Sequence, residues 1–268
     1  MLFSILIAHY NNFRYFKECY KSILEQSYQN FEIIIIDDCS TDNSLEQIEF
    51  LTRTDSRVKI FKNKINKGVG FTKKKCVEMS SGEICGFLDP DDALTKDALE
   101  ISVKAFNRKK IVACYSQLYF CDENLNVQKI YKHSRQIKNN NPKFLNINFE
   151  VAHFFSFRKS VYLQTEGLNE NYKVAEDQDL ILKIYEKGSF KFIKRPLYYY
   201  RIHNKGLSHD QSKIALRQKT WHTVLIKALE RRKTLKIYNK LISQIDNLPE
   251  FIFKKQNTFF AKITRKIS

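Results

Sequence analysis

Four short apolar runs, each followed by polar residues and a helical pattern, constrain the fold of this chain most strongly. The runs predict buried strands at residues 2–8, 31–36, 58–61 and 83–88. Apolar residues recur at helical spacing within residues 13–27, 40–51, 69–79 and 94–106. Strands that alternate with helices of this length predict βαβ units. The expected fold is therefore α/β, with a doubly wound, mainly parallel sheet.

This rhythm changes after residue 110. Further strands are expected at residues 111–120, 127–131, 190–193 and 197–201, with a helix at 176–187 and an Asn-rich loop at 137–142. Beyond His209 the pattern predicts a long helical stretch with a break at Pro249. We therefore predict a domain of residues 1–208, made of two halves (1–110 and 111–208), and a basic helical extension over residues 209–268.

The formal net charge is +17, from 46 Lys and Arg against 29 Asp and Glu. Residues 201–268 hold 16 basic and 4 acidic side chains, a net of +12, which leaves +5 for residues 1–200. An excess spread over the whole chain would indicate nucleic acid or an anionic membrane as partner. The basic, amphipathic end is read either as helices that pack on the domain with a solvated face or as a surface that faces a partner. That partner would be anionic lipid, in a peripheral contact, or an acidic glycan acceptor.

The six cysteines contain no Cys-x-x-Cys pair, so reduced thiols are expected rather than a disulfide framework or a zinc site. Residues 1–8 lack the basic leader of a signal peptide. No apolar run reaches the roughly 20 residues that span a bilayer. We expect a cytoplasmic protein, with peripheral contact at the inner face of the cytoplasmic membrane as an option.

Two of the expected strands end on acids. Asp37 and Asp38 follow one strand, and the Asp89-x-Asp91 pair follows another. The carboxyl ends of parallel strands meet at one edge of a sheet, where ligands bind. Either cluster alone is equally well read as a helix cap or a solvated loop, but two at one edge indicate a metal ion or a polar ligand. Mg²⁺ or Mn²⁺ shared with a nucleoside diphosphate suits such carboxylates.

A glycine-containing segment, Asn66-x-Gly68-x-Gly70, precedes the helix expected at residues 69–79. Glycines at a helix entrance allow close backbone approach and direct N–H groups toward an anion. This spacing is neither the dinucleotide-binding nor the P-loop pattern, and by itself it is a weak signal.

Six segments in order resemble a family 2 glycosyltransferase of the GT-A fold, in its bacterial surface-glycan assembly branch. They are AHYN at 8–11, DDCSTD at 37–42, NKGVG at 66–70, FLDPDD at 87–92, AEDQDL at 175–180 and YRIH at 200–203. The resemblance covers roughly residues 1–210. It implies a GT-A-like catalytic domain with a nucleotide-binding half followed by an acceptor half.

The resemblance implies transfer, with inversion, from a nucleotide-sugar, most naturally a UDP-sugar, to a hydroxyl of a saccharide acceptor. It places the acceptor in cell-surface glycan assembly (lipooligosaccharide, capsule or similar), with a lipid-linked acceptor as one option. The implied nucleotide-sugar-binding residues are Ala8, Tyr10, Asp37, Asp38, Asn66, Gly68, Lys73 and Asp89. Within this set Asp38 would accept a hydrogen bond from uracil and Asp89 would face the ribose.

The same resemblance places the divalent metal on Asp91, with His203 as a candidate further ligand. Lys73 stands where the family usually has arginine, so the charge is kept and bidentate geometry is lost. Glu176 and Asp177 match the motif of the catalytic base. We assign Asp177 as general base and Glu176 as its neighbour on the acceptor. The plainer reading of this pair is a helix N-terminus enriched in acids.

Two other classes of protein remain as alternatives. The basic end would suit a nucleic-acid or anionic-surface binding protein, although the acidic sheet edge argues against nucleic acid there. A sugar nucleotidyltransferase shares an α/β fold, but we find no convincing Gly- and Arg-rich triphosphate loop near the N-terminus. The sequence therefore favours a glycosyltransferase with no nucleic-acid partner.

Overall fold

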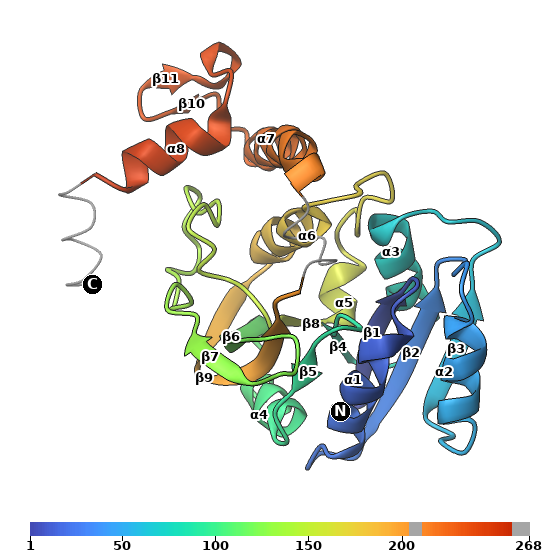
Figure 1. Cartoon of the computed structure of the whole chain (residues 1–268). Coiled ribbons are helices and arrows are strands. Elements are labelled where there is room, and N and C mark those ends of the chain that lie inside the picture. The colour runs from blue at the N-terminus through green and yellow to red at the C-terminus, as the bar shows by residue number, and fades with distance from the viewer. Residues whose placement is uncertain (204–210, 259–268) are drawn as a thin grey trace.

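Parallel strands and helices alternate through the first hundred residues of the computed structural model, which describes residues 1–203 and 211–258 (Figure 1). The first elements are β1 (Phe3–His9), α1 (Phe13–Leu24), β2 (Phe31–Asp37), α2 (Ser44–Thr52), β3 (Val58–Lys62), α3 (Val69–Met79), β4 (Ile84–Phe87), β5 (Ala93–Leu94) and α4 (Ala98–Ala105). The next are β6 (Ile111–Cys121), β7 (Val127–Ile130), β8 (Ser156–Arg158), α5 (Lys159–Tyr162), α6 (Glu176–Tyr185) and β9 (Ser189–Arg201).

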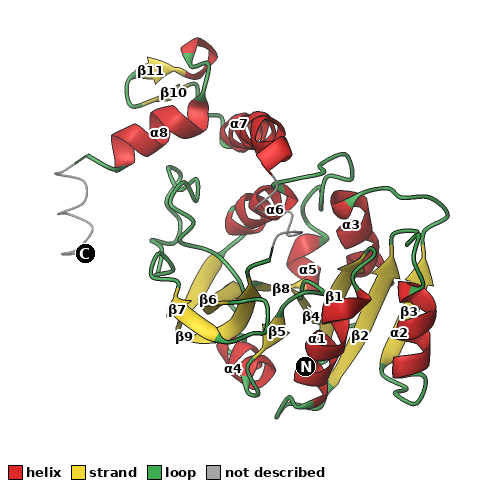
Figure 2. Cartoon of the chain, viewed as in Figure 1, coloured by secondary structure: helices red, strands yellow, loops and turns green. Residues whose placement is uncertain are grey.

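The main sheet has the strand order β3-β2-β1-β4-β8-β6-β9-β5, and β7 pairs with β6 (Figure 2). Strands β1 to β4 pair in parallel, as do β6 and β9. Strand β8 lies antiparallel between β4 and β6. Strand β5 pairs antiparallel with β9, and β7 pairs antiparallel with β6. The sheet is thus mixed, with four parallel strands in the N-terminal half and a second parallel pair, β6 and β9, in the rest. The predicted α/β, doubly wound fold is confirmed.

Strand β2 shows why helices cover both faces of the sheet. Alternate side chains of a strand point to opposite faces. Ile33 and Ile35 therefore join one apolar cluster with Phe16 of α1. Ile34 and Ile36 join another with Val77 of α3. Each fully buried isoleucine contributes about 1.5–3 kcal/mol, so a one-residue slip of this strand is strongly disfavoured.

The C-terminal extension consists of α7 (Ile214–Arg231), a hairpin of β10 (Lys236–Ile237) and β11 (Lys240–Leu241), and α8 (Leu248–Gln256), with short 3₁₀ turns at Gln211–Lys213 and Ile242–Gln244. Its apolar cluster brings Val224 and Ile252 together with Leu182 of α6 and with Leu145. Figure 1 shows α7 beside α6. The predicted C-terminal helices are thus present, and they pack on the preceding domain. None of the helices described is long and apolar enough to span a membrane.

Three expectations about secondary structure were wrong. The extension is not helical throughout, because Tyr238 and Asn239 adopt positive φ angles of 48° and 64° between β10 and β11. Pro249 lies in the first turn of α8, a position where its missing N–H costs nothing. The helix expected from residue 94 begins only at Ala98, because Leu94 pairs with Tyr198 in the sheet.

The strands expected at 190–193 and 197–201 are one continuous strand, β9. It pairs with β6 through register shifts, one of them between the pairs Ser116↔Ile193 and Gln117↔Pro196. The shift accommodates the proline, which has no N–H to donate to the ladder. The basic side chains of Lys262, Arg265 and Lys266 lie outside the described residues.

Candidate active site at the carboxyl edge of the sheet

The predicted acidic clusters meet at one edge of the parallel strands. His9 at the end of β1 is in register with Asp37 at the end of β2, and Asp89 comes two residues after β4. Ala8 is half-buried in β1, and Tyr10 is exposed just beyond it. Asn66 is exposed on the loop that follows β3. This edge therefore holds the residues predicted to bind a nucleotide-sugar.

The Asp37 carboxylate is fully buried and held by its neighbours. His9 Nδ1 donates to Asp37 Oδ1 at 3.3 Å, and the Ser40 N–H donates to Oδ2 at 2.9 Å. The N–H of Asn12 donates to His9 Nε2 at 3.3 Å, so the ring proton resides on Nδ1. Burial raises the pKa of Asp37, but the hydrogen bonds from His9 and Ser40 outweigh it and lower the pKa below its usual value. The ionised Asp37 carboxylate thus links the end of β1, through His9, to the loop after β2, through Ser40.

Asp38 anchors the loop that leads into α3. Its Oδ1 accepts from Asn63 Nδ2 at 2.8 Å and from the Lys67 N–H at 2.9 Å, and its Oδ2 accepts from the Gly68 N–H at 2.7 Å. Gly68 has φ +86°, a conformation that favours glycine. The carboxylate thus has internal partners on both oxygens, and its contact with uracil stays a prediction.

The glycine segment differs from its predicted role. Its N–H groups at Gly68 and Gly70 do not face an open anion site, because the first binds the Asp38 carboxylate and the second donates to the Tyr172 carbonyl at 3.1 Å. A Cβ at Gly70 would lie 2.4 Å from that carbonyl oxygen, closer than any real contact. Gly70 is required for close backbone packing between α3 and the 169–172 loop.

Lys73 of α3 connects the donor side of the edge to the helix that carries the candidate base. Its Nζ lies 2.9 Å from Glu176 Oε1 and 3.5 Å from Asp89 Oδ1. Burial lowers the pKa of Lys73, but Asp89 and Glu176 outweigh it and raise the pKa above its usual value, so the ammonium stays charged. The pKa of Asp89 is lowered by Lys73 in spite of burial. Lys73 is paired with these two acids in this structure, and its phosphate contact remains a prediction.

Glu176 and Asp177 occupy the first turn of α6 but have different surroundings. Glu176 is 6% exposed, and burial raises its pKa while Lys73 lowers it in part. The structure turns this carboxylate inward onto Lys73, and its contact with the acceptor stays a prediction. Asp177 is half-buried. Among the described residues its carboxylate accepts from Gln178, with Oδ1 2.8 Å from the N–H and Oδ2 3.3 Å from Nε2. Of the two acids, Asp177 is the one open to solvent.

Asp91 and His203 meet although 112 residues separate them, with His203 Nε2 2.8 Å from Asp91 Oδ2. The Asp91 side chain is 22% exposed, whereas His203 is buried and its Nδ1 has no hydrogen-bond partner within residues 1–203 and 211–258. These residues include no group of three or more His, Cys, Asp or Glu that could hold a metal. Mg²⁺ is commonly bound by one or two carboxylates together with substrate phosphates. The pair therefore fits a cation that it shares with a diphosphate.

Sequence reasoning missed Asp92 and Arg201, which hold the Asp91 loop in place. Asp92 Oδ2 accepts from the Tyr198 hydroxyl and Oδ1 from the Arg201 N–H, each at 2.7 Å. The guanidinium of Arg201 is 1% exposed; it donates to the Asp91 carbonyl at 2.6 Å and pairs with Glu18 at 2.6 Å. An arginine inside an apolar strand was the available signal, because a charge at such a position needs partners.

Carboxylates gathered at the carboxyl edge of a parallel half-sheet, together with helices on both faces, define an α/β fold of the GT-A type. Two solved structures share it. The chain superposes on Staphylococcus aureus TarS 1-349 in complex with UDP-GlcNAc with a TM-score of 0.72, at 20% identity over 86% of this chain and 66% of that one. The mannosyltransferase PcManGT of Pyrobaculum calidifontis, in complex with GDP-Man and Mn²⁺, gives a TM-score of 0.63 at 14% identity, over 99% of this chain and 78% of that one.

The chain belongs to glycosyl transferase family 2, whose model matches residues 4–164. It is 33% identical to the chondroitin synthase of Pasteurella multocida over an alignment of 273 positions, and the match covers 98% of this chain. The match spans only 27% of that relative's length. Membership of this family favours the glycosyltransferase prediction over the two alternative classes.

Proposed function

We propose that this chain transfers a sugar from a UDP-sugar to a hydroxyl of a saccharide acceptor, with inversion at the anomeric carbon. The observation that carries this proposal is the position of Lys73, which lies within 3.5 Å of Asp89 and 2.9 Å of Glu176. Lys73 thus bridges Asp89, a predicted donor contact, and Glu176, the neighbour of the candidate base Asp177. The UDP-GlcNAc complex of TarS and the similarity to a chondroitin synthase support this choice of substrates.

Asp177 is proposed as the general base. It is open to solvent in the first turn of α6, where the positive end of the helix favours an ionised carboxylate. Asp177 takes the proton from the acceptor hydroxyl while that oxygen attacks the anomeric carbon. The nucleoside diphosphate leaves from the opposite face, so the configuration inverts.

The donor is proposed to lie along the carboxyl edge, over Ala8 and Tyr10, with the uracil toward Asp37 and Asp38. The remaining predicted donor contacts are Asn66, Gly68, Lys73 and Asp89. Asp91 and His203 would hold Mg²⁺ or Mn²⁺, which would neutralise charge on the diphosphate. Lys73 keeps its positive charge beside this site, so it supports the same anion from the protein side.

The test is sugar transfer from a panel of nucleotide-sugars to saccharide acceptors, followed by mass spectrometry. Asp177→Asn removes the base and should lower kcat by about 10²–10⁴. Asp91→Ala should weaken both activity and its dependence on divalent cation. Glu170→Gln, an exposed acid paired with Lys74 at 3.0 Å, is the matched control and should retain activity. Full activity of both Asp177→Asn and Asp91→Ala would refute the assigned site.

We further propose that the acceptor belongs to cell-surface glycan assembly, lipooligosaccharide, capsule or similar, and that the extension (residues 209–268) docks on anionic lipid at the cytoplasmic face. This places the enzyme in the cytoplasm, next to a lipid-linked acceptor. Exposed apolar side chains beside basic ones support it: Leu235 is 78% exposed next to Lys236, and Phe253 is 51% exposed next to Lys254. Apolar area plus positive charge is the combination that binds such surfaces.

Flotation with vesicles of phosphatidylserine and phosphatidylcholine tests the membrane contact. Each basic side chain near the surface contributes about 1 kcal/mol, so Lys254→Glu/Lys255→Glu should lower binding by more than tenfold. Lys109→Glu/Lys110→Glu, on the turn before β6, is the charge-matched control. Equal binding by both double variants would contradict docking through the extension.

A further inference from the structure

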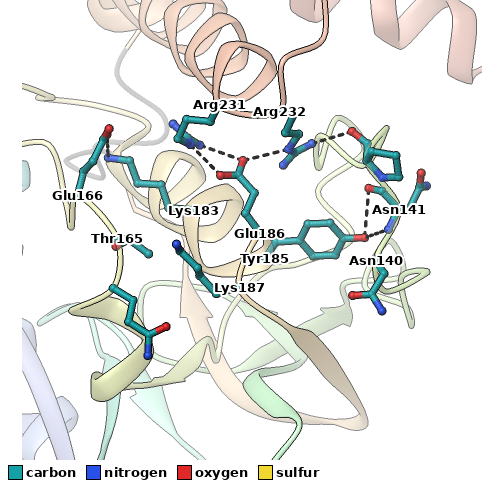
Figure 3. A pocket seen from close by; sticks show the side chains of 12 residues that line it. Asn140, Asn141, Thr165, Glu166, Lys183, Tyr185, Glu186, Lys187, Arg231 and Arg232 are labelled. Carbon is teal, nitrogen blue, oxygen red and sulfur yellow. Dashed lines mark hydrogen bonds and ion pairs between the residues drawn. The ribbon is translucent and has the colours of Figure 1, made fainter.

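A cavity of about 660 Å³ lies away from the acidic edge, where the last turn of α6 meets the end of α7 (Figure 3). Two loops complete it, one around residues 140–142 and one at residues 164–166. Its volume is in the range of small-molecule and sugar-sized ligand sites. None of the predicted donor, metal or base residues lines it.

Positive charge exceeds negative charge in this cavity. Arg231 and Arg232 both donate to one carboxylate, that of Glu186, at 2.8 Å and 3.0 Å (Figure 3). One acid thus faces two guanidinium groups. Lys187 is exposed on the wall and has no ion pair with any other described residue. At least one uncompensated positive charge remains for a ligand.

The fourth basic side chain of the cavity is already matched. Lys183 Nζ lies 2.7 Å from Asp179 Oδ2 and 2.8 Å from the Gly167 carbonyl oxygen. The second acid of the wall, Glu166, is 3.6 Å from Lys183 and 72% exposed. The excess charge therefore lies on the side of Lys187, Arg231 and Arg232.

Two helices end at this cavity, α6 at Tyr185 and α7 at Arg231, and helix C-termini favour cations. That accounts for basic residues here, but not for an open cavity walled by amides and hydroxyls. Asn140 and Asn141 on one loop, and Gln164 and Thr165 on the other, supply such groups. Amide and hydroxyl groups pair with sugar hydroxyls, and guanidinium or ammonium groups pair with an oxyanion.

Helix α6 connects this cavity to the candidate base. Asp177 lies in its first turn and Tyr185 is its last residue. Eight residues of α-helix rise about 12 Å, so the two sites are within reach of one oligosaccharide.

We propose that this cavity binds an acidic sugar unit of the acceptor glycan, with its carboxylate on Lys187 and the Arg231–Arg232 pair. This inference rests on the proposed function, because it takes the acceptor to be a saccharide. Its role is to hold the glycan by a unit remote from the reacting hydroxyl. Neutral glycans lack the charge that this wall complements.

Isothermal titration of the full chain with three probes tests the proposal. The probes are hyaluronan hexasaccharide, with a carboxylate on alternate rings, neutral chitohexaose and inorganic phosphate. The acidic hexasaccharide should bind at least tenfold more tightly than chitohexaose, and Lys187→Glu should weaken it about tenfold, the loss of one charge-assisted contact. Lys109→Glu is the charge-matched control and should bind as the unmodified chain does.

Equal binding of the acidic and neutral hexasaccharides, or equal weakening by Lys187→Glu and Lys109→Glu, overturns the proposal. Phosphate binding as tight as that of the acidic hexasaccharide also overturns it, because it reveals a site for free anions only. UDP binding by the unmodified chain, measured in parallel, tests the proposed function separately. Absence of UDP binding contradicts that function, whereas the comparison of the two hexasaccharides bears on the cavity alone.

Discussion

The two ends of helix α6 differ in how fully their charged side chains are paired within the protein. At its first turn, the buried Glu176 pairs with Lys73, whereas the neighbouring Asp177 is half-buried and open to solvent. Just after its last turn, one carboxylate, that of Glu186, faces both Arg231 and Arg232, and Lys187 is exposed. The charge of Glu176 is matched within the protein, so this pair is suited to fixing the geometry beside Asp177. The basic end has an excess of one sign, so it is suited to a charged ligand from outside.

The largest expected effect tests the matching at the acidic end. Lys73→Met leaves Glu176 buried without a countercharge, which should cost about 3–5 kcal/mol in the free energy of unfolding. Denaturation in urea measures this loss. Lys74→Met is the matched control, because it removes only the partly exposed pair with Glu170 and should cost less than about 1 kcal/mol.

A double variant separates charge from packing at the same position. Lys73→Met/Glu176→Gln removes both charges, so it should recover much of the stability lost in the single variant. If the single variant unfolds within about 1 kcal/mol of the unmodified chain, the acidic end is not held by this ion pair.

The second prediction concerns pH. The folded pKa of Asp37 lies below its usual 3.8, because the hydrogen bonds from His9 and Ser40 outweigh burial. Its contribution to stability is therefore fully present above about pH 4 and is lost as the pH falls through the folded value. Lysine and arginine keep their charge over this range, so acid should loosen the acidic edge and leave the basic cavity charged.

Urea denaturation at pH 7, 4 and 3 measures this difference. Asp37→Asn removes charge-assisted hydrogen bonds and should cost about 2–3 kcal/mol at pH 7, with a smaller loss on acidification than the unmodified chain shows. Parallel declines of the two proteins below pH 4 would show that Asp37 is not the group responsible.

The smallest expected effect concerns the basic end. Glu186→Gln removes a carboxylate that both guanidinium groups contact, which should cost about 1–2 kcal/mol. Thermal or urea unfolding measures it. Glu166→Gln is the control and should change stability by less than about 0.5 kcal/mol, since its side chain is 72% exposed. An equal effect of both substitutions would remove the distinction between these two acids.

The strands of the N-terminal half could be predicted from the sequence because their apolar runs indicate burial on both faces of the sheet. A run such as Ile33–Ile36 is apolar on both faces, so it predicts a buried parallel strand that ends on Asp37. Strand β5 and the continuity of β9 could not be predicted. The first depends on Leu94 pairing with Tyr198 across a hundred residues, and the second on the pairing of β9 with β6 on both sides of Pro196. No local pattern records either pairing.

The candidate site likewise contains residues that the sequence could predict and contacts that it could not. The acids at the edge are visible because they follow strands directly, and the contact between Asp91 and His203 agrees with the motifs that named them. The partners of Asp38, Lys73 and Glu176 were not visible, because each is set by tertiary packing. The cavity at the end of α6 was missed entirely, since four separate segments contribute its walls.

Gly70 has a consequence for exchanging parts between relatives. A Cβ at this position would lie 2.4 Å from the Tyr172 carbonyl oxygen and 2.6 Å from that of Asn169. Residue 70 belongs to the first half of the predicted domain (residues 1–110), whereas the two carbonyls belong to the second (residues 111–208). A chimera that takes residues 1–110 from another family member can close this junction only with glycine at the equivalent of position 70. If the relative has any larger residue at this position, its segment equivalent to residues 169–172 would have to be exchanged together with residues 1–110.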